Sequence, residues 1–203
     1  MKFDTPIVQT TFQSPLGTMI IAATAKGLAG LWFEGQRHLP PELGGPDQSA
    51  PLRAAPSKHS PLGGQRITRS EKRGGHTLWP ADPEHPVLKN VSQQLAEYFA
   101  GQRNRFEVPL DLACGTAFQQ SVWQALLAIP YGRTASYGEV SRRIGKPTAV
   151  RAVGAAVGRN PVSIIVPCHR VMGANGSLTG YAGGLDRKTA LLKLEGALQE
   201  TLL

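Results

Sequence analysis

The chain has 203 residues, with 22 Lys and Arg against 14 Asp and Glu, and two cysteines. This length suits one large or two small domains. No stretch approaches the roughly 18 apolar residues of a membrane span, and the first residues lack the apolar segment of a signal peptide. Two cysteines are too few for a disulfide framework or a Cys-rich zinc site. We therefore expect a soluble, cytoplasmic protein without metal or cofactor.

The formal net charge of +8 indicates a polyanionic partner. The charge is unevenly distributed along the chain. Residues 48–79 carry +5 and residues 116–203 carry +6, whereas the remainder is net acidic. The two basic segments therefore need separate explanations.

The N-terminal part has the pattern of β-structure. Apolar and β-branched runs occupy residues 7–12, 18–25 and 28–33, with turn signals at residues 14–17 and 26–27 between them. This spacing predicts a three-stranded meander.

The proline-rich stretch that follows has no regular period and few large apolar residues. It cannot bury enough surface to offset the entropy of ordering, so it predicts a disordered insertion over residues 45–82. Its positive charge is expected to be a solvated charge run. Non-specific attraction to phosphate is the alternative.

Regular secondary structure is expected to begin again at Pro86. Apolar side chains then recur at helical spacing, at Val87, Val91, Leu95 and Phe99. Gly101 is the stop signal of this helix, and residues 105–112 read as a further strand. The N-terminal domain, residues 1–113, is therefore predicted to be a small β-sheet with one helix.

Residues 114–203 are predicted to form a mainly helical domain. Thr116 with Gln119, and Ser136 with Glu139, have the spacing of capping boxes that open helices. The second of these helices, a turn at Gly145 and a third helix over residues 148–158 suggest a helix-turn-helix, which is winged-helix-like. The predicted fold class is therefore α+β.

The third helix has two different faces. One face is expected to pack inward, at Val150, Val153 and Val157. The opposite face carries Arg151, Ala155 and Gly158. These small residues would let another backbone approach closely, although packing of a neighbouring helix explains them equally well.

The most informative segment contains Cys168, His169 and Arg170. An electropositive setting typically lowers a thiol pKa from about 8.5 and so yields thiolate. A Cys–His pair also needs a group that orients the imidazole, and Glu195, flanked by apolar residues, suits this role. From spacing alone, a structural cysteine is the alternative. Cys114 has no base nearby and is expected to be a small buried hydrophobe.

The sequence of residues 167–171, Pro-Cys-His-Arg-Val, resembles the active-site motif of the O6-alkylguanine-DNA alkyltransferases (methylated-DNA–protein-cysteine methyltransferases). The resemblance covers almost all of residues 116–197. Its further matches are residues 118–126, 136–138, 151–154, 160–161, 180–184 and 194–196. The N-terminal domain is similar more loosely, at residues 14–17 and 95–99.

This resemblance implies DNA repair by direct, stoichiometric transfer of an alkyl group from O6-alkylguanine, with O4-alkylthymine as a further candidate substrate. Cys168 would accept the group and the protein would be inactivated. His169 would take the thiol proton through a water, and Glu195 would hold the imidazole. Asn160 would fix the backbone before the cysteine, and Tyr137 would assist the leaving guanine.

The resemblance also implies a monomer that binds double-stranded DNA in the minor groove and extrudes the alkylated nucleotide. Arg151 matches the residue that fills the vacated stack. Further DNA contacts are expected at Gln119, Gly138 and Lys146, and the substrate pocket at Ser163, Val166 and Tyr181. Ser163 stands where some relatives have a proline that narrows the pocket, so bulkier alkyl groups are expected to fit.

Two other classes of protein stay open. The first is a non-catalytic alkylated-DNA-binding protein of the alkyltransferase-like type, whose members replace the cysteine. The second is a Cys–His hydrolase, which needs an oxyanion hole for which the sequence offers no clear candidate.

Overall fold

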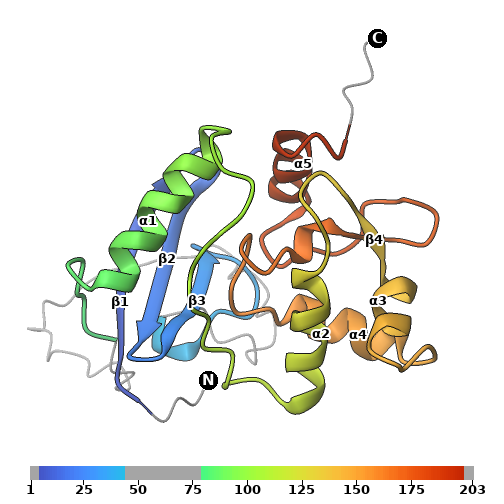
Figure 1. Ribbon diagram of the computed structural model, residues 1–203, viewed down its shortest axis with the longest axis horizontal. Coiled ribbons are helices and arrows are strands. Elements are labelled where there is room, and N and C mark those ends of the chain that lie inside the picture. Colours follow the sequence, from blue (N-terminus) through green and yellow to red (C-terminus); the bar gives the residue numbers. More distant parts are fainter. Residues whose placement is uncertain (1–4, 44–78, 199–203) are drawn as a thin grey trace, which may run out of the picture.

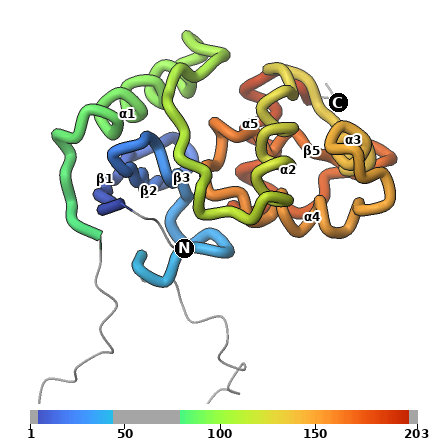
Figure 2. The backbone as a smooth tube through the Cα atoms, turned by 60° about the horizontal axis from the view of Figure 1, so that its bottom comes forward, coloured from blue at the N-terminus to red at the C-terminus, as the bar shows by residue number. Residues whose placement is uncertain are grey.

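The computed structural model describes residues 5–43 and 79–198. Its two halves lie side by side, as both Figure 1 and Figure 2 show. The first half contains a three-stranded sheet and one helix, and the second half is mainly helical. The predicted α+β architecture is confirmed.

The sheet is the predicted meander. Strands β1 (Ile7–Ser14), β2 (Gly17–Thr24) and β3 (Gly27–Phe33) are antiparallel, in the order β1-β2-β3. Strand β3 is buried along its whole length. Its side chains enter two clusters: Leu31 and Phe33 join the main core, and Trp32 joins a smaller cluster on the opposite face. Leu28 also joins the main core, because the pairing of β2 with β3 shifts register between Ala22 and Ala23.

Residues 79–82, the end of the predicted disordered insertion, are placed beside β1. The backbone N–H of Gln9 donates to the Pro80 carbonyl (2.9 Å), and that of Asp82 donates to the Gln9 carbonyl (3.0 Å). The Trp79 ring lies 6.0 Å from the Trp32 ring. The remainder of that insertion, residues 45–78, lies outside the described residues.

Helix α1 (Pro86–Phe99) packs on one face of the sheet and runs along β1 and β2 (Figure 1). Its buried side chains are Leu88, Val91, Gln94, Leu95 and Tyr98. The predicted strand over residues 105–112 is wrong apart from one parallel bridge, between Leu28 and Leu110. Pro109 has no N–H to donate to a ladder, and this segment carries the chain into the second half.

The second half contains four helices in its described part: α2 (Ala117–Leu127), α3 (Tyr137–Arg143), α4 (Val150–Gly158) and α5 (Leu185–Leu194). Both predicted capping boxes are present, at the starts of α2 and α3. Strands β4 (Ala135–Ser136) and β5 (Val171–Met172) pair in parallel. Two short 3-10 helices, η1 (Pro41–Leu43) and η2 (Cys168–Arg170), complete the described elements.

Helix α4 packs against α2, where the indole N–H of Trp123 donates to the Ala156 carbonyl (2.9 Å). Val153 and Val157 are buried as predicted. The prediction for Val150 is wrong, because this side chain is 40% exposed at the first position of the helix, before the helix reaches the core.

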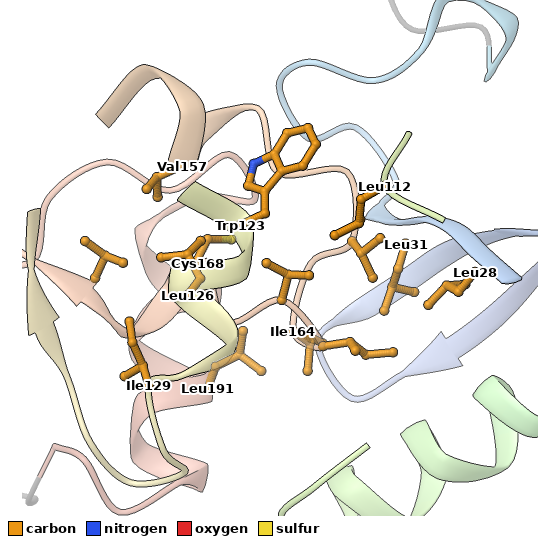
Figure 3. Packing of buried hydrophobic residues seen from close by; sticks show 14 of the residues in the cluster. Leu28, Leu31, Leu112, Trp123, Leu126, Ile129, Val157, Ile164, Cys168 and Leu191 are labelled. Carbon is orange, nitrogen blue, oxygen red and sulfur yellow. The ribbon is translucent and has the colours of Figure 1, made fainter. Parts of the chain in front are cut away.

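One hydrophobic core joins the two halves. Figure 3 shows it running from Leu28 and Leu31 of β3, past Ile164, to Leu126 of α2 and to Cys168. The position of Cys168 therefore depends on the packing of both halves. No helix in residues 5–43 and 79–198 is long and apolar enough to cross a membrane.

Substitution of Gly27 tests the close packing of β3 against the segment at Pro109. Its φ is 146°, and a Cβ atom there would lie 2.4 Å from the Pro109 carbonyl oxygen. We expect Gly27→Ala to lower the free energy of unfolding in urea by about 2–4 kcal/mol, because backbone strain and a backbone clash add together. Gly35→Ala is the control: φ is 73°, and no described atom lies within 4 Å of its Cβ position. Equal losses in the two variants would contradict the steric explanation.

Candidate active site

The chain reaches the cysteine through a tight turn that β3 holds in place. The backbone N–H of Leu31 donates to the Pro161 carbonyl (2.9 Å), and the Ser163 N–H donates to the Leu31 carbonyl (2.8 Å). Ile164 has a φ of 71°, in the left-handed region that a β-branched residue rarely adopts. The surrounding contacts must therefore impose this conformation.

Asn160 links this turn to the thiol. Its Nδ2 donates to the Val166 carbonyl (2.7 Å) and to Sγ of Cys168 (3.0 Å). Its Oδ1 accepts from the Val162 N–H (3.0 Å). One buried amide thus holds both ends of the turn and also contacts the sulfur atom.

The thiol of Cys168 is only 5% exposed. Burial raises its pKa, while the Asn160 amide, the charge of Lys188 and two backbone N–H groups act in the opposite direction. The predicted lowering of this pKa by neighbouring positive charge is therefore wrong. The guanidinium of Arg170 instead binds Glu195, and the desolvation of a thiolate outweighs the remaining favourable groups.

His169 is oriented by Glu195. Its Nε2 lies 2.8 Å from Glu195 Oε1, and both side chains are fully buried. Because an ionised carboxylate only accepts hydrogen bonds, Nε2 carries the proton and Nδ1 is left as an acceptor. Nδ1 is buried and has no hydrogen-bond partner within the described residues. Burial lowers the pKa of His169, and Glu195 opposes this shift, so the imidazole is neutral and available as a base.

The carboxylate of Glu195 accepts four hydrogen bonds. Oε1 accepts from His169 Nε2 (2.8 Å), Tyr98 OH (2.7 Å) and Arg170 Nη2 (3.0 Å), and Oε2 accepts from Arg170 Nε (2.7 Å). Burial alone would raise the pKa of Glu195, but hydrogen bonds and charge from His169 and Arg170 lower it to about 2. The carboxylate is therefore ionised at neutral pH.

Lys188 is a further buried charge beside the site. Its Nζ donates to the Val171 and Thr179 carbonyls, both at 2.6 Å. Burial lowers the pKa of Lys188 to about 8, and the nearby Cys168 opposes this shift. Sequence reasoning missed Lys188, although its helical spacing with the buried Leu191, Leu192 and Glu195 could have indicated an inward position.

Tyr98 lies within the helix predicted to begin at Pro86, and the sequence indicates no role for it in the site. Its hydrogen bond to Glu195 joins residues 97 positions apart, so no local pattern indicates it. Arg170 was noted for its charge, but the partner of that charge depends on where α5 ends. Both residues were therefore beyond a local reading of the sequence.

The other predicted site residues lie in two places. On the surface of α3 and α4, Tyr137 is half-buried with its ring against Gly154, Gly138 follows it, and Lys146 and Arg151 are exposed. Gln119 forms part of the capping box of α2. Nearer the core, Ser163 and Val166 are buried.

Tyr181 lies in the loop before α5. Burial raises the pKa of its hydroxyl well above the ordinary value, and hydrogen bonding by Ser163 opposes this shift. Its ring lines a cavity of about 470 Å³, together with Gly35, Arg37, Ala182 and Arg187 among others. Cys168 does not line this cavity, so the structure does not itself connect the thiol to it.

The ion pair of Arg170 and Glu195 yields a stability prediction. We expect Arg170→Met to lower the free energy of unfolding by about 3–5 kcal/mol at neutral pH, because it leaves a buried carboxylate short of donors. The folded pKa of Glu195, about 2, is below its ordinary value of 4.5. The charge of Glu195 therefore contributes to the free energy of unfolding above pH 4.5, and this contribution is lost as the pH falls towards 2. The difference in unfolding free energy between variant and wild type should shrink over the same pH range.

Urea denaturation at a series of pH values measures this gap. Arg103→Met is the matched control, since Arg103 forms a 2.7 Å ion pair with Glu97 that is partly open to solvent. Its effect should be small and screened by salt. A loss in Arg170→Met that is independent of pH would contradict the role assigned to the Glu195 charge.

Comparisons with known proteins identify the family of the chain. Residues 7–112 match the ribonuclease-like domain of 6-O-methylguanine DNA methyltransferase, and residues 117–197 match its DNA-binding domain. A methylated-DNA–protein-cysteine methyltransferase of Mycobacterium leprae is 59% identical over 113 residues, covering 56% of this chain and 68% of the relative. One of Mycobacterium bovis is 55% identical over 130 residues, covering 64% and 77%.

Solved structures give the same result. The O6-methylguanine methyltransferase of Mycobacterium tuberculosis superimposes with a TM-score of 0.70 at 40% identity, covering 96% of both chains. A structure of the Mycobacterium tuberculosis protein OGT in complex with DNA gives 0.68 at 42% identity, covering 92% of this chain and 91% of the other. The chain belongs to the 6-O-methylguanine DNA methyltransferase family.

Proposed function

We propose that Cys168 is the alkyl acceptor of this methyltransferase, and that Asn160, His169 and Glu195 prepare its thiol for attack. The activity itself is the direct reversal of DNA alkylation, and DNA is the partner. The observation that supports Cys168 is its place beside a buried His169–Glu195 pair whose free imidazole nitrogen, Nδ1, can accept a proton.

The proton transfer follows from the pKa directions. Burial keeps the Cys168 thiol protonated, so attack requires a base. The thiol proton passes to Nδ1 of His169, directly or through a water, and the ionised Glu195 balances the imidazolium charge. Because the pKa of Glu195 is about 2, the carboxylate does not take the proton from the imidazole.

The alkyl transfer is a single displacement. Sγ of Cys168 forms a bond to the alkyl carbon as the bond from that carbon to guanine O6 breaks. The electron pair stays on the guanine, which then takes up one proton. By resemblance to the family, the hydroxyl of Tyr137 assists this last step. The thioether product has no leaving group that water can displace, so each molecule reacts once.

DNA is expected to bind over α3 and α4. Five cationic side chains are exposed on these helices and the turns beside them: Arg142, Arg143, Lys146, Arg151 and Arg159. The O6 atom is inaccessible inside a duplex, so the nucleotide must be extruded. We infer that α4 enters the minor groove, because Ala155 and Gly158 on the exposed face of Arg151 allow close approach.

By resemblance to the family, we expect the protein to act as a monomer. The non-catalytic alkyltransferase-like alternative is not supported, since the relatives named above are methyltransferases and Cys168 is present. The Cys–His hydrolase has no support from the comparisons.

Intact-mass measurement tests the acceptor. After incubation with duplex DNA carrying O6-methylguanine, we expect one methyl group per protein molecule, located on Cys168 by peptide mapping. Cys168→Ala should show no gain, because the nucleophile is absent. Cys114→Ala is the matched control and should gain the methyl group normally, since Cys114 is partly buried in a separate pocket, with His38 and Arg159, and not beside His169 and Glu195. A methyl group on Cys114, or repeated turnover, would overturn the assignment.

Substitution of Arg151 tests the extrusion of the nucleotide. We expect Arg151→Ala to slow transfer from duplex DNA about tenfold or more, and to slow reaction with the free base O6-benzylguanine less than about twofold. Because a free base needs no extrusion, the loss of Arg151 should slow the reaction with duplex DNA much more than the reaction with the free base. Arg133→Ala removes a different exposed arginine and should leave both rates unchanged. Equal losses on both substrates would contradict the role of Arg151.

A further inference from the structure

The carboxylate that orients His169 is itself bound by the N-terminal half of the molecule. Tyr98, near the end of α1, donates its hydroxyl hydrogen to Oε1 of Glu195 at 2.7 Å. The same oxygen accepts from His169 Nε2 at 2.8 Å. A side chain outside the DNA-binding domain thus contacts the atom on which the base depends.

The position of the Tyr98 hydroxyl is fixed by packing. The side chain is completely buried, and its ring lies 5.4 Å from both Phe99 and Phe106 and 6.4 Å from Tyr131. Burial and the charge of Glu195 raise the pKa of Tyr98 far above its ordinary value. The hydroxyl therefore keeps its proton and remains a donor at every pH at which the protein functions.

Three donors share the oxygen Oε1 of Glu195: Tyr98, His169 and Arg170. A hydrogen bond to an anionic oxygen stabilises its negative charge and weakens its attraction for other protons. The Tyr98 hydroxyl also limits the directions from which Oε1 can accept. The position of Oε1 sets the orientation of the His169 ring, and its acceptor strength sets how tightly the ring holds its protons. Within the described residues, no other side chain forms a hydrogen bond with the His169 ring.

We propose that Tyr98 is a positioning residue of the alkyl transfer: it holds Glu195 Oε1 against His169 Nε2 and limits the proton affinity of the imidazole. This inference rests on the proposed function of His169 as the base. It assigns the N-terminal half a part in setting the pH range of the reaction.

Several titratable or charged groups face the His169–Glu195 pair. They are Tyr98 from α1, Tyr131 from the turn after α2, Cys168 and Arg170 from η2, Tyr181 from the loop before α5, and Lys188 from α5. A test of Tyr98 must leave Arg170 and Lys188 in place, and must separate the titration of His169 from that of Cys168.

NMR titration of His169 in the Cys168→Ala protein meets both conditions. We expect Tyr98→Phe to raise the pKa of His169 by about 0.5–1 unit, because Oε1 loses one donor and attracts the imidazole proton more strongly. The substitution removes a single oxygen atom and keeps the ring contacts, so the fold should be retained. The His169 resonances are assigned by their loss in His169→Gln.

Tyr131→Phe is the matched control. Tyr131 lies in the same aromatic cluster, and its hydroxyl donates to the Leu194 carbonyl (3.1 Å) rather than to the carboxylate. We expect this variant to leave the His169 pKa within about 0.2 unit of the parent value. An unchanged pKa in Tyr98→Phe, or an equal shift in both variants, overturns the proposal.

Single-turnover transfer from O6-methylguanine duplex DNA supplies the second readout, with Cys168 restored. In Tyr98→Phe we expect the rate to fall about three- to tenfold at a pH below the His169 pKa measured by NMR, which is the largest effect that a rise of about 0.5–1 unit allows. At about pH 8.5 the rate should stay within about twofold, since only neutral imidazole accepts the thiol proton. The dissociation constant for DNA should not change. A loss of the same size at both pH values would indicate a merely structural role and overturn the proposal.

The two hypotheses fail in different ways. The assignment of Cys168 as acceptor is tested by the mass gain of one methyl group in wild-type protein and by its absence in Cys168→Ala. That result does not depend on the role of Tyr98. The proposal for Tyr98 depends on the His169 titration, which needs no transfer.

Discussion

The buried carboxylate of Glu195 is the group on which the site depends. Removing a carboxylate from water costs several kcal/mol of free energy unless its oxygens are paired with a cation and hydrogen-bonded. Here the donors come from opposite parts of the chain, with Tyr98 on α1 and His169 and Arg170 on η2. The two halves of the molecule must therefore pack in this one arrangement for the charge to be stabilised, and the same arrangement orients the base.

The N-terminal half supports the active site at several points besides Glu195. Strand β3 forms backbone hydrogen bonds with the turn before Cys168, through Leu31 and Ser163. The guanidinium of Arg187, on α5, donates to the Leu16 carbonyl (3.0 Å) and lies 4.6 Å from the centre of the Phe33 ring. The sheet therefore acts as a scaffold that fixes the turn, the loop at Tyr181 and the last helix relative to one another.

The environment of the thiol suits a protein that reacts only once. Burial raises the pKa of Cys168, so a free thiolate is not exposed to stray electrophiles in solution. In the proposed reaction the imidazole of His169 takes the thiol proton, and Glu195 already holds its Nε2 at 2.8 Å in this structure. On that proposal, the thiol stays protonated at rest and the base is in place for the attack on the alkyl carbon.

The sequence alone determined the three strands of the N-terminal sheet, helices α1 to α4 and both capping boxes, because these depend on residues within a few positions of one another. It also indicated Cys168, His169 and Glu195, through a motif and the apolar neighbours of one acid. Only the tertiary structure decided that Arg170 binds Glu195 instead of activating the thiol, that Lys188 donates to the Val171 and Thr179 carbonyls, and that Tyr98 completes the carboxylate site. It also left residues 105–112 without a strand, apart from one bridge. The physical reason is separation: contacts between residues up to 97 positions apart form only when the two halves share one core, and no local pattern encodes which buried donor meets which buried acceptor.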